Sequence, residues 1–147
     1  MGFSFDFCVG TVSKVPTKFT GNSSSNIRIF RPHGSPLDLL KNDVLFDLLW
    51  KHGITTKSLK DVSSSASEKE YVYIYAEHEL TNRSVYNQRM CAQSCSYILE
   101  KVNSLIKFVE NNIVRRREDT LESLHSMRTM LSSAILRKHN YCLFVPT

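Results

Sequence analysis

The sequence predicts a two-layer α+β fold in which a small mixed or antiparallel sheet of about four strands packs on three helices. Stretches with the two-residue alternation of β-strands lie near both ends of the chain. The segment from Arg83 to Lys138 contains neither proline nor glycine and carries a long apolar stripe with helical spacing. We therefore expect the last two helices to form a long C-terminal hairpin.

The first two strands are expected at residues 3–12 and 26–30. In the first, apolar side chains occupy every second position from Phe3 to Val9, which is the period of a half-buried strand. A loop marked by Pro16 and by the glycine- and serine-rich residues 21–25 separates the two strands.

A helix is expected to follow the turn at residues 31–34. Ser35 is suited to the N-cap position and Pro36 to the first helical position. Leucine and valine side chains between Leu37 and Leu49 form an apolar face, and His52 and Gly53 provide a typical helix end.

Two further strands are predicted by aromatic and β-branched residues. Residues 54–70 form a polar, serine-rich loop, and Tyr71–Tyr75 is the third strand. Tyr141–Val145 is the last strand and ends at Pro146. We expect this last strand to join the sheet, because an exposed apolar strand would promote aggregation.

The C-terminal helices begin after Thr81 or Asn82, either of which can serve as an N-cap. Their apolar residues recur at alternating spacings of three and four, which keeps one face apolar. The residues that we expect to make an interaction surface on this stripe are Ile98, Val102, Leu105, Val109, Leu124 and Leu131.

The junction between the two helices is expected between Asn111 and Thr120. Asn112 can end the first helix in a left-handed conformation, and Asp119 can cap the second. The alternative is one continuous helix of about 55 residues, roughly 80 Å long.

Composition indicates a single globular domain over residues 1–147. Charged residues make up 22% of the chain and the net charge is +5, which favours acidic partners. No apolar run is long enough to span a bilayer and no signal peptide is recognisable, so we expect a cytoplasmic or nuclear protein. No nucleophile motif, phosphate loop or metalloprotease motif occurs, so we expect no enzyme, no cofactor and no small-molecule substrate.

A zinc site is an alternative use of the cysteines. Cys91 and Cys95 would share one helix face, and a hairpin could bring His139 and Cys142 close to them. The spacing matches no common zinc finger, and buried cysteines also act as small core residues.

Duplex RNA is the alternative partner. Basic side chains on the outer face of the helices could contact phosphates without reading sequence. The residues in question are Lys101, Lys107, Arg115, Arg116, Arg117 and Arg128.

The leading functional hypothesis is a non-enzymatic regulatory or accessory protein that acts through protein interaction. We expect the C-terminal helices to mediate self-association or docking onto a partner, because their apolar stripe is wider than a sheet of four short strands can cover. The sequence resembles no family that would name the partner.

Overall fold

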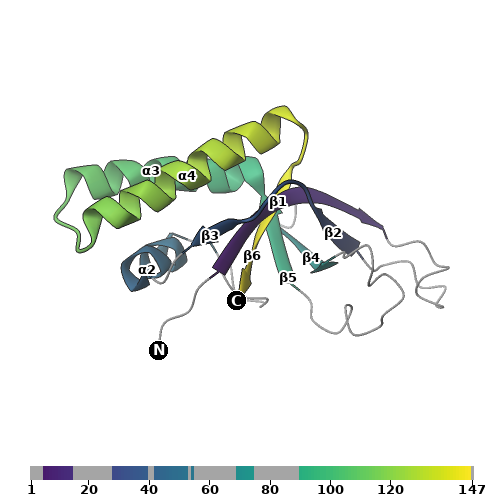
Figure 1. Cartoon of the computed structure of the whole chain (residues 1–147), viewed down its shortest axis with the longest axis horizontal. Coiled ribbons are helices and arrows are strands. Elements are labelled where there is room, and N and C mark those ends of the chain that lie inside the picture. Colours follow the sequence, from purple (N-terminus) through teal and green to yellow (C-terminus); the bar gives the residue numbers. More distant parts are fainter. Residues whose placement is uncertain are drawn as a thin grey trace.

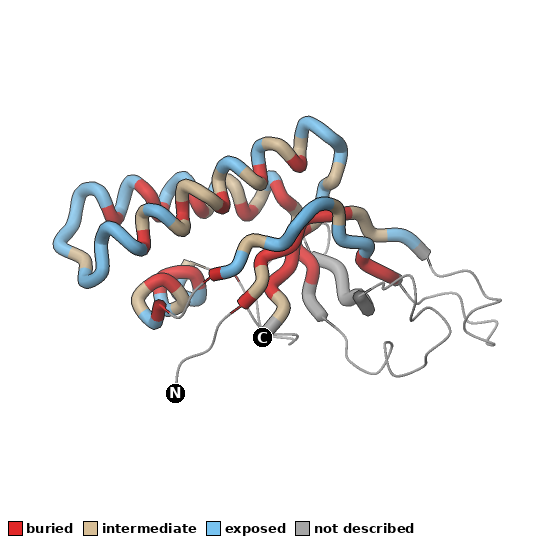
Figure 2. Tube along the Cα trace, in the orientation of Figure 1, coloured by how far each residue is buried: buried red, intermediate tan, exposed pale blue. Residues whose placement is uncertain are grey.

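The computed structural model describes residues 5–14, 28–39, 42–52, 54, 69–74 and 90–146. Two long helices, α3 (Cys95–Asn111) and α4 (Arg117–Leu136), lie side by side over a curved sheet, and the shorter helix α2 (Asp43–Lys51) lies next to them (Figure 1). The buried residues gather between these helices and the sheet (Figure 2). The α+β class and the C-terminal helical hairpin are therefore confirmed.

The described part of the sheet contains six strands, two more than the four predicted. The additional strands are β3 and β5. The strands are β1 (Phe5–Lys14), β2 (Arg28–Pro32), β3 (Leu37–Leu39), β4 (Lys69–Ile74), β5 (Met90–Ser94) and β6 (Tyr141–Pro146).

Five of these strands form a closed ring. The strand order is β2-β4-β5-β6-β1-β3, and β2 also pairs with β1. The N-terminal half of β1 pairs with β6 on one edge and β3 on the other, whereas its C-terminal half pairs with β2. The β2–β4 pair is parallel and the other described pairs are antiparallel.

Because the sheet closes on itself, β1 is buried on both faces. Phe5, Phe7 and Val9 belong to the core beneath the helices. Cys8 belongs to a second buried cluster with Phe30, Ala92 and Leu143. Successive strand residues point to opposite faces, so this second cluster fills the ring. The first strand was expected to be buried on one face only, and this is wrong, because neighbouring strands cover the second face of β1 as well.

Gly10 stands where β1 leaves β3 and begins to pair with β2. A Cβ atom at this position would collide with the backbone oxygen of Arg31 and lie 3.0 Å from Cζ of Phe30. The absence of a side chain lets the Phe30 ring, which is completely buried, lie against the strand.

The helix expected at residues 36–52 is shorter than predicted. Leu37–Leu39 forms strand β3, which pairs with Phe5–Phe7, and the helix begins only at Asp43. The local Ser35-Pro36 signal is overridden because pairing with β1 buries Leu39. The end of the helix at His52 agrees with the prediction.

Asn42 caps α2 and also ties it to α4. Its side-chain oxygen accepts hydrogen bonds from the backbone N–H groups of Val44 and Leu45. Its Nδ2 donates to Oγ1 of Thr120 on α4 at 3.0 Å. Asn42 and Thr120 are both buried, so this hydrogen bond is shielded from water.

The helix expected from Arg83 begins later, at Cys95. Met90–Ser94 forms strand β5 between β4 and β6, and the side chain of Ser94 caps α3 by accepting from the N–H of Tyr97. Cys91 and Cys95 therefore do not share a helix face. Residues 83–89 and the predicted caps Thr81 and Asn82 lie outside the described residues.

The hairpin junction differs in detail from the prediction. Asn112 is extended, with φ −131° and ψ 161°, and its Nδ2 donates to the backbone oxygen of Phe108. The left-handed residue is Arg116, with φ 52°, which occupies the N-cap position predicted for Asp119. Asp119 instead forms an ion pair with Arg116 at 3.3 Å.

The remaining predicted segments agree with the structure where it describes them. Strand β4 covers most of the predicted strand at residues 71–75, and β6 coincides with the predicted C-terminal strand. Most of the predicted polar loop, residues 55–68, lies outside the described residues.

Candidate functional site

The predicted interaction stripe lies in the core. All six side chains have 0% of their surface exposed and pack between the helices and the sheet. These residues are Ile98, Val102, Leu105, Val109, Leu124 and Leu131. They hold the hairpin onto the sheet and are not presented to a partner in this structure.

The arginines at the hairpin junction stabilise the hairpin itself. Arg117 donates from Nε to the backbone oxygen of Val109 at 3.3 Å and from Nη2 to that of Glu110 at 3.4 Å. It therefore supplies the positive charge that the C-terminal end of α3 favours. Arg116 is paired with Asp119, and Arg115 is exposed.

The other predicted phosphate-binding residues lie further along the two helices. The ammonium group of Lys101 lies 5.3 Å from the centre of the Tyr97 ring, and Lys107 is exposed. Arg128 contacts Nδ1 of His125 at 2.8 Å. Four of the six basic residues, counting Arg116 and Arg117, thus have partners within the chain.

The hairpin brings Cys95 and His139 of the suggested zinc site together. Sγ of Cys95 donates to the backbone oxygen of His139, and Sγ of Cys142 donates to that of Gln93. The side chain of Cys91 lies outside the described residues. Within the described residues, no group of three histidine, cysteine, aspartate or glutamate side chains could hold a metal ion.

A groove runs along one side of α4, where the helix faces β3 and the connection between β2 and β3. It consists of three cavities of about 230, 470 and 410 Å³. The first two share Leu37 and Ser126, and the last two share Ser35, Thr129 and Met130. Because neighbouring cavities share walls, we treat them as one site and name it the α4 groove.

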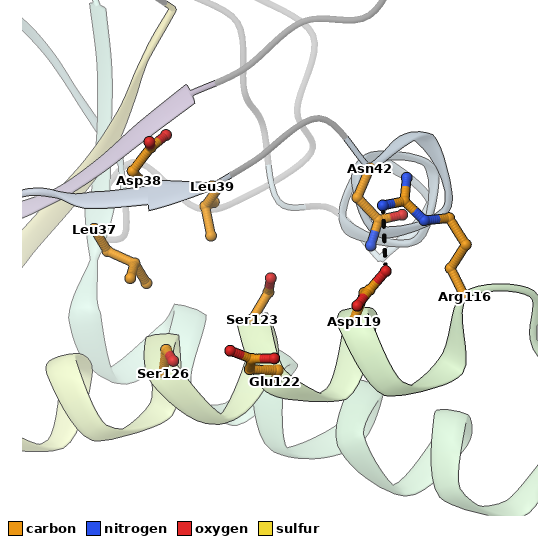
Figure 3. A pocket seen from close by; sticks show the side chains of 9 residues that line it. All are labelled: Leu37, Asp38, Leu39, Asn42, Arg116, Asp119, Glu122, Ser123 and Ser126. Carbon is orange, nitrogen blue, oxygen red and sulfur yellow. Dashed lines mark hydrogen bonds and ion pairs between the residues drawn. The ribbon is translucent and has the colours of Figure 1, made fainter.

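The end of the α4 groove near the hairpin junction is acidic. Figure 3 shows Leu37 and Leu39 pointing from β3 toward α4, while the Arg116–Asp119 ion pair lies beside Asn42. Glu122 also lines this cavity, so two carboxylates accompany one guanidinium, whereas the carboxylate of Asp38 points away from α4 (Figure 3). This end therefore favours a positively charged group on a ligand.

The middle of the α4 groove has no aspartate, glutamate, lysine or arginine among its described lining residues. Met130 and Pro36 provide apolar surface, and Ser126 and Thr129 provide hydroxyl groups. Ser123, Ser126, Thr129 and Ser133 recur three or four positions apart, which places them on one side of the helix. Their small side chains leave room for a ligand above the helix.

The opposite end of the α4 groove is basic. His33, Arg137 and His139 line it, and no aspartate or glutamate is found among its lining residues in the described part of the chain. The imidazole rings of His33 and His139 are stacked, with their centres 4.0 Å apart and their planes at 14°. Oγ1 of Thr11 lies 3.2 Å from Nε2 of His33.

Burial lowers the pKa of His33, and the neighbouring His139 and Arg31 lower it further. Burial withdraws water from the protonated ring, and His139 and Arg31 place positive charge near it, so each of these causes disfavours the protonated form. A bound anion would raise the pKa of His33.

Most residues of the α4 groove escape sequence reasoning. Sequence analysis assigned Arg116 and His139 to other candidate sites, and Ser35, Pro36, Leu37 and Asp119 to helix structure. The signal that could have been used is the repeated spacing of small hydroxyl residues on α4. It becomes meaningful only once β3 is known to face that side of the helix.

Comparison with protein-family models, curated proteins and solved structures found no match. None of the helices in the described residues has the length and apolar character required to cross a membrane.

Proposed function

We propose that this chain is a non-enzymatic protein-interaction module that binds an extended segment of another protein in the α4 groove. The observation that carries the proposal is a row of adjoining cavities with carboxylates at one end and a guanidinium and two imidazoles at the other. A segment with a basic residue at one end and an acidic group at the other would complement both.

The length of the groove fits a short peptide. Its lining residues on α4 extend from Arg116 to Arg137, which at 1.5 Å per residue corresponds to roughly 30 Å. An extended chain advances about 3.3 Å per residue, so about nine residues would span the groove. The uncharged middle would accept small or apolar side chains.

The charge distribution favours a peptide over duplex RNA. A phosphate backbone is negative along its whole length, and the carboxylates Asp119 and Glu122 would repel it at one end of the groove. The engagement of Arg116 and Arg117 within the hairpin also leaves fewer cations for phosphates.

The test is selection from a library of nine-residue peptides, followed by fluorescence anisotropy with the selected sequences. We expect peptides with Lys or Arg at one end and Asp or Glu at the other. Glu122→Lys should weaken their binding about 5- to 10-fold, since a favourable ion pair becomes a repulsion. Glu118→Lys is the matched control, because Glu118 lies on the same helix, is exposed and does not line the groove.

Three results would contradict the proposal. The first is a library that yields no binder, and the second is an equal loss of affinity in the Glu118 and Glu122 variants. The third is salt-dependent binding of duplex RNA that is abolished by replacing Arg115, Arg116 and Arg117 with alanine. If light scattering shows a mass that rises with protein concentration without peptide, and Glu122→Lys abolishes this rise, the groove is filled by a second copy instead.

A further inference from the structure

The basic end of the α4 groove is built from three separate parts of the chain. His33 comes from the connection between β2 and β3, His139 from the connection between α4 and β6, and Arg137 from the end of α4. Thr129 and Ser133 precede Arg137 at intervals of four residues, so all three lie along one side of the helix. The cavity that they line measures about 410 Å³.

Arg137 is not required to complete the end of the helix. The last carbonyl oxygens of α4 already accept hydrogen bonds from the backbone N–H groups of Arg137, Lys138 and His139. Among the residues that the structure describes, no hydrogen bond or ion pair engages the Arg137 guanidinium. Its charge is therefore available to a ligand in the cavity.

The chemistry of these groups suits an oxyanion with several oxygen atoms. A guanidinium can donate two parallel hydrogen bonds to one oxyanion. Hydroxyl groups of Ser35 and Ser133 line the same cavity, and the two imidazoles add donors when protonated. The Thr129 hydroxyl instead donates to the backbone oxygen of His125. A phosphate group can accept from more of these donors at once than a carboxylate, because it offers three terminal oxygens.

We propose that this pocket binds a phosphate group carried by a phosphorylated side chain of the peptide that occupies the α4 groove. The part of this proposal that makes a peptide the carrier of the phosphate rests on the proposed function, whereas the phosphate-binding site itself does not. The acidic far end of the groove favours a peptide with a single phosphate over a nucleic acid, whose neighbouring phosphates would meet Asp119 and Glu122.

Binding of phosphate should be visible at the histidines. Protonation of His33 is opposed by burial, by His139 and by Arg31, while Arg137 adds positive charge along the cavity wall. A phosphate dianion would offset these charges, so its binding should raise the pKa of His33.

The first experiment titrates the full chain with inorganic phosphate and follows the imidazole signals of His33 and His139 by NMR. We expect saturable shifts of both signals and an upward shift of the His33 pKa. Arg137→Gln should weaken binding at least 10-fold, because it removes a charged donor and leaves the helix end intact. Arg115→Gln is the control, since Arg115 is exposed at the opposite end of α4.

The second experiment compares a groove-binding peptide with and without one phosphoserine at the end that contacts the basic pocket. We expect the phosphorylated form to bind at least 10-fold more tightly, and Arg137→Gln to remove the difference.

Absence of saturable phosphate shifts, or equal weakening by Arg115→Gln, would overturn the site. Phosphate binding without preference for the phosphorylated peptide would contradict the claim that a peptide carries the phosphate. Tighter binding of single-stranded RNA than of the phosphorylated peptide would contradict the same claim. Failure of unphosphorylated peptides to bind would contradict the proposed function alone, because the inorganic phosphate titration requires no peptide.

Discussion

Replacing Asn42 by alanine tests how α2 and α4 are joined. The change removes the acceptor for two backbone N–H groups at the start of α2 and the donor for Oγ1 of Thr120. Loss of the helix cap should cost about 1 kcal/mol. Loss of a partner for the buried Thr120 hydroxyl should cost about 1–3 kcal/mol more. The expected total is therefore about 2–4 kcal/mol, a large share of the roughly 5–15 kcal/mol that stabilises a typical domain.

Urea unfolding is the appropriate assay, followed by far-UV circular dichroism and by fluorescence of Trp50, the single tryptophan in the chain. With a slope of about 2 kcal/mol per molar urea, the expected loss moves the midpoint down by about 1–2 M. Asn42→Asp is the matched variant. It keeps an oxygen acceptor at the cap and can accept a hydrogen bond from Thr120, so it should lose less stability than Asn42→Ala.

A double-mutant cycle isolates the bond between the two buried side chains. Thr120→Val removes the hydroxyl at nearly constant volume, and the cycle with Asn42→Ala should give a coupling energy of about 1 kcal/mol. A coupling energy near zero, or a loss below about 0.5 kcal/mol for Asn42→Ala alone, would refute this account of how the helices are joined.

Three further predictions concern the ring of strands and the stacked imidazoles. Gly10→Ala should destabilise the chain by more than about 3 kcal/mol or prevent folding, because backbone atoms occupy the place of the new Cβ. The control is Gly34→Ala, which should cost only about 1 kcal/mol, because φ is +79° there and no atom lies within 4 Å of the new Cβ. Similar midpoints of thermal unfolding for the two variants would show that β1 can shift. Burial and His139 lower the pKa of His33, so the stability of the fold should decrease as the pH drops below about 6.5, where the unfolded chain binds the proton more readily than the folded chain. His33→Gln should make Tm less dependent on pH, and an unchanged dependence would contradict this prediction. Burial raises the pKa of Cys8 to about 11, so its thiol should not react with iodoacetamide at pH 8.5 in the folded chain but should react in urea. Peptide mass spectrometry measures the labelling, and rapid labelling of the folded protein would mean that the ring of strands opens.

The hairpin was predictable because its determinants are local. An apolar repeat and an interrupting polar stretch are properties of neighbouring residues, and they correctly favoured two helices over one. The details of the junction were not predictable in the same way. The side chain of Arg117 reaches back to carbonyl oxygens of α3, and such a contact exists only after the helices have packed.

Strands β3 and β5 were missed because partners elsewhere in the chain decide their conformation. Residues 36–39 carry a good local helix start, and residues 90–94 lie in a segment free of proline and glycine. Pairing with β1 in the first case, and with β4 and β6 in the second, overrides these local preferences. The α4 groove depends on the first of these pairings, so the sequence alone could not reveal it.

The ring of strands also constrains when this protein can fold. Strand β1 obtains its β6 partner only after residues 141–146 have been synthesised, since Phe5 pairs with Pro146 and Gly10 with Tyr141. Until those residues leave the ribosome, one edge of β1 remains open and the Cys8–Phe30 face stays accessible to water. Such long-range pairing slows folding and exposes apolar surface meanwhile. The two buried faces of β1 are therefore covered only after β6 has joined the ring.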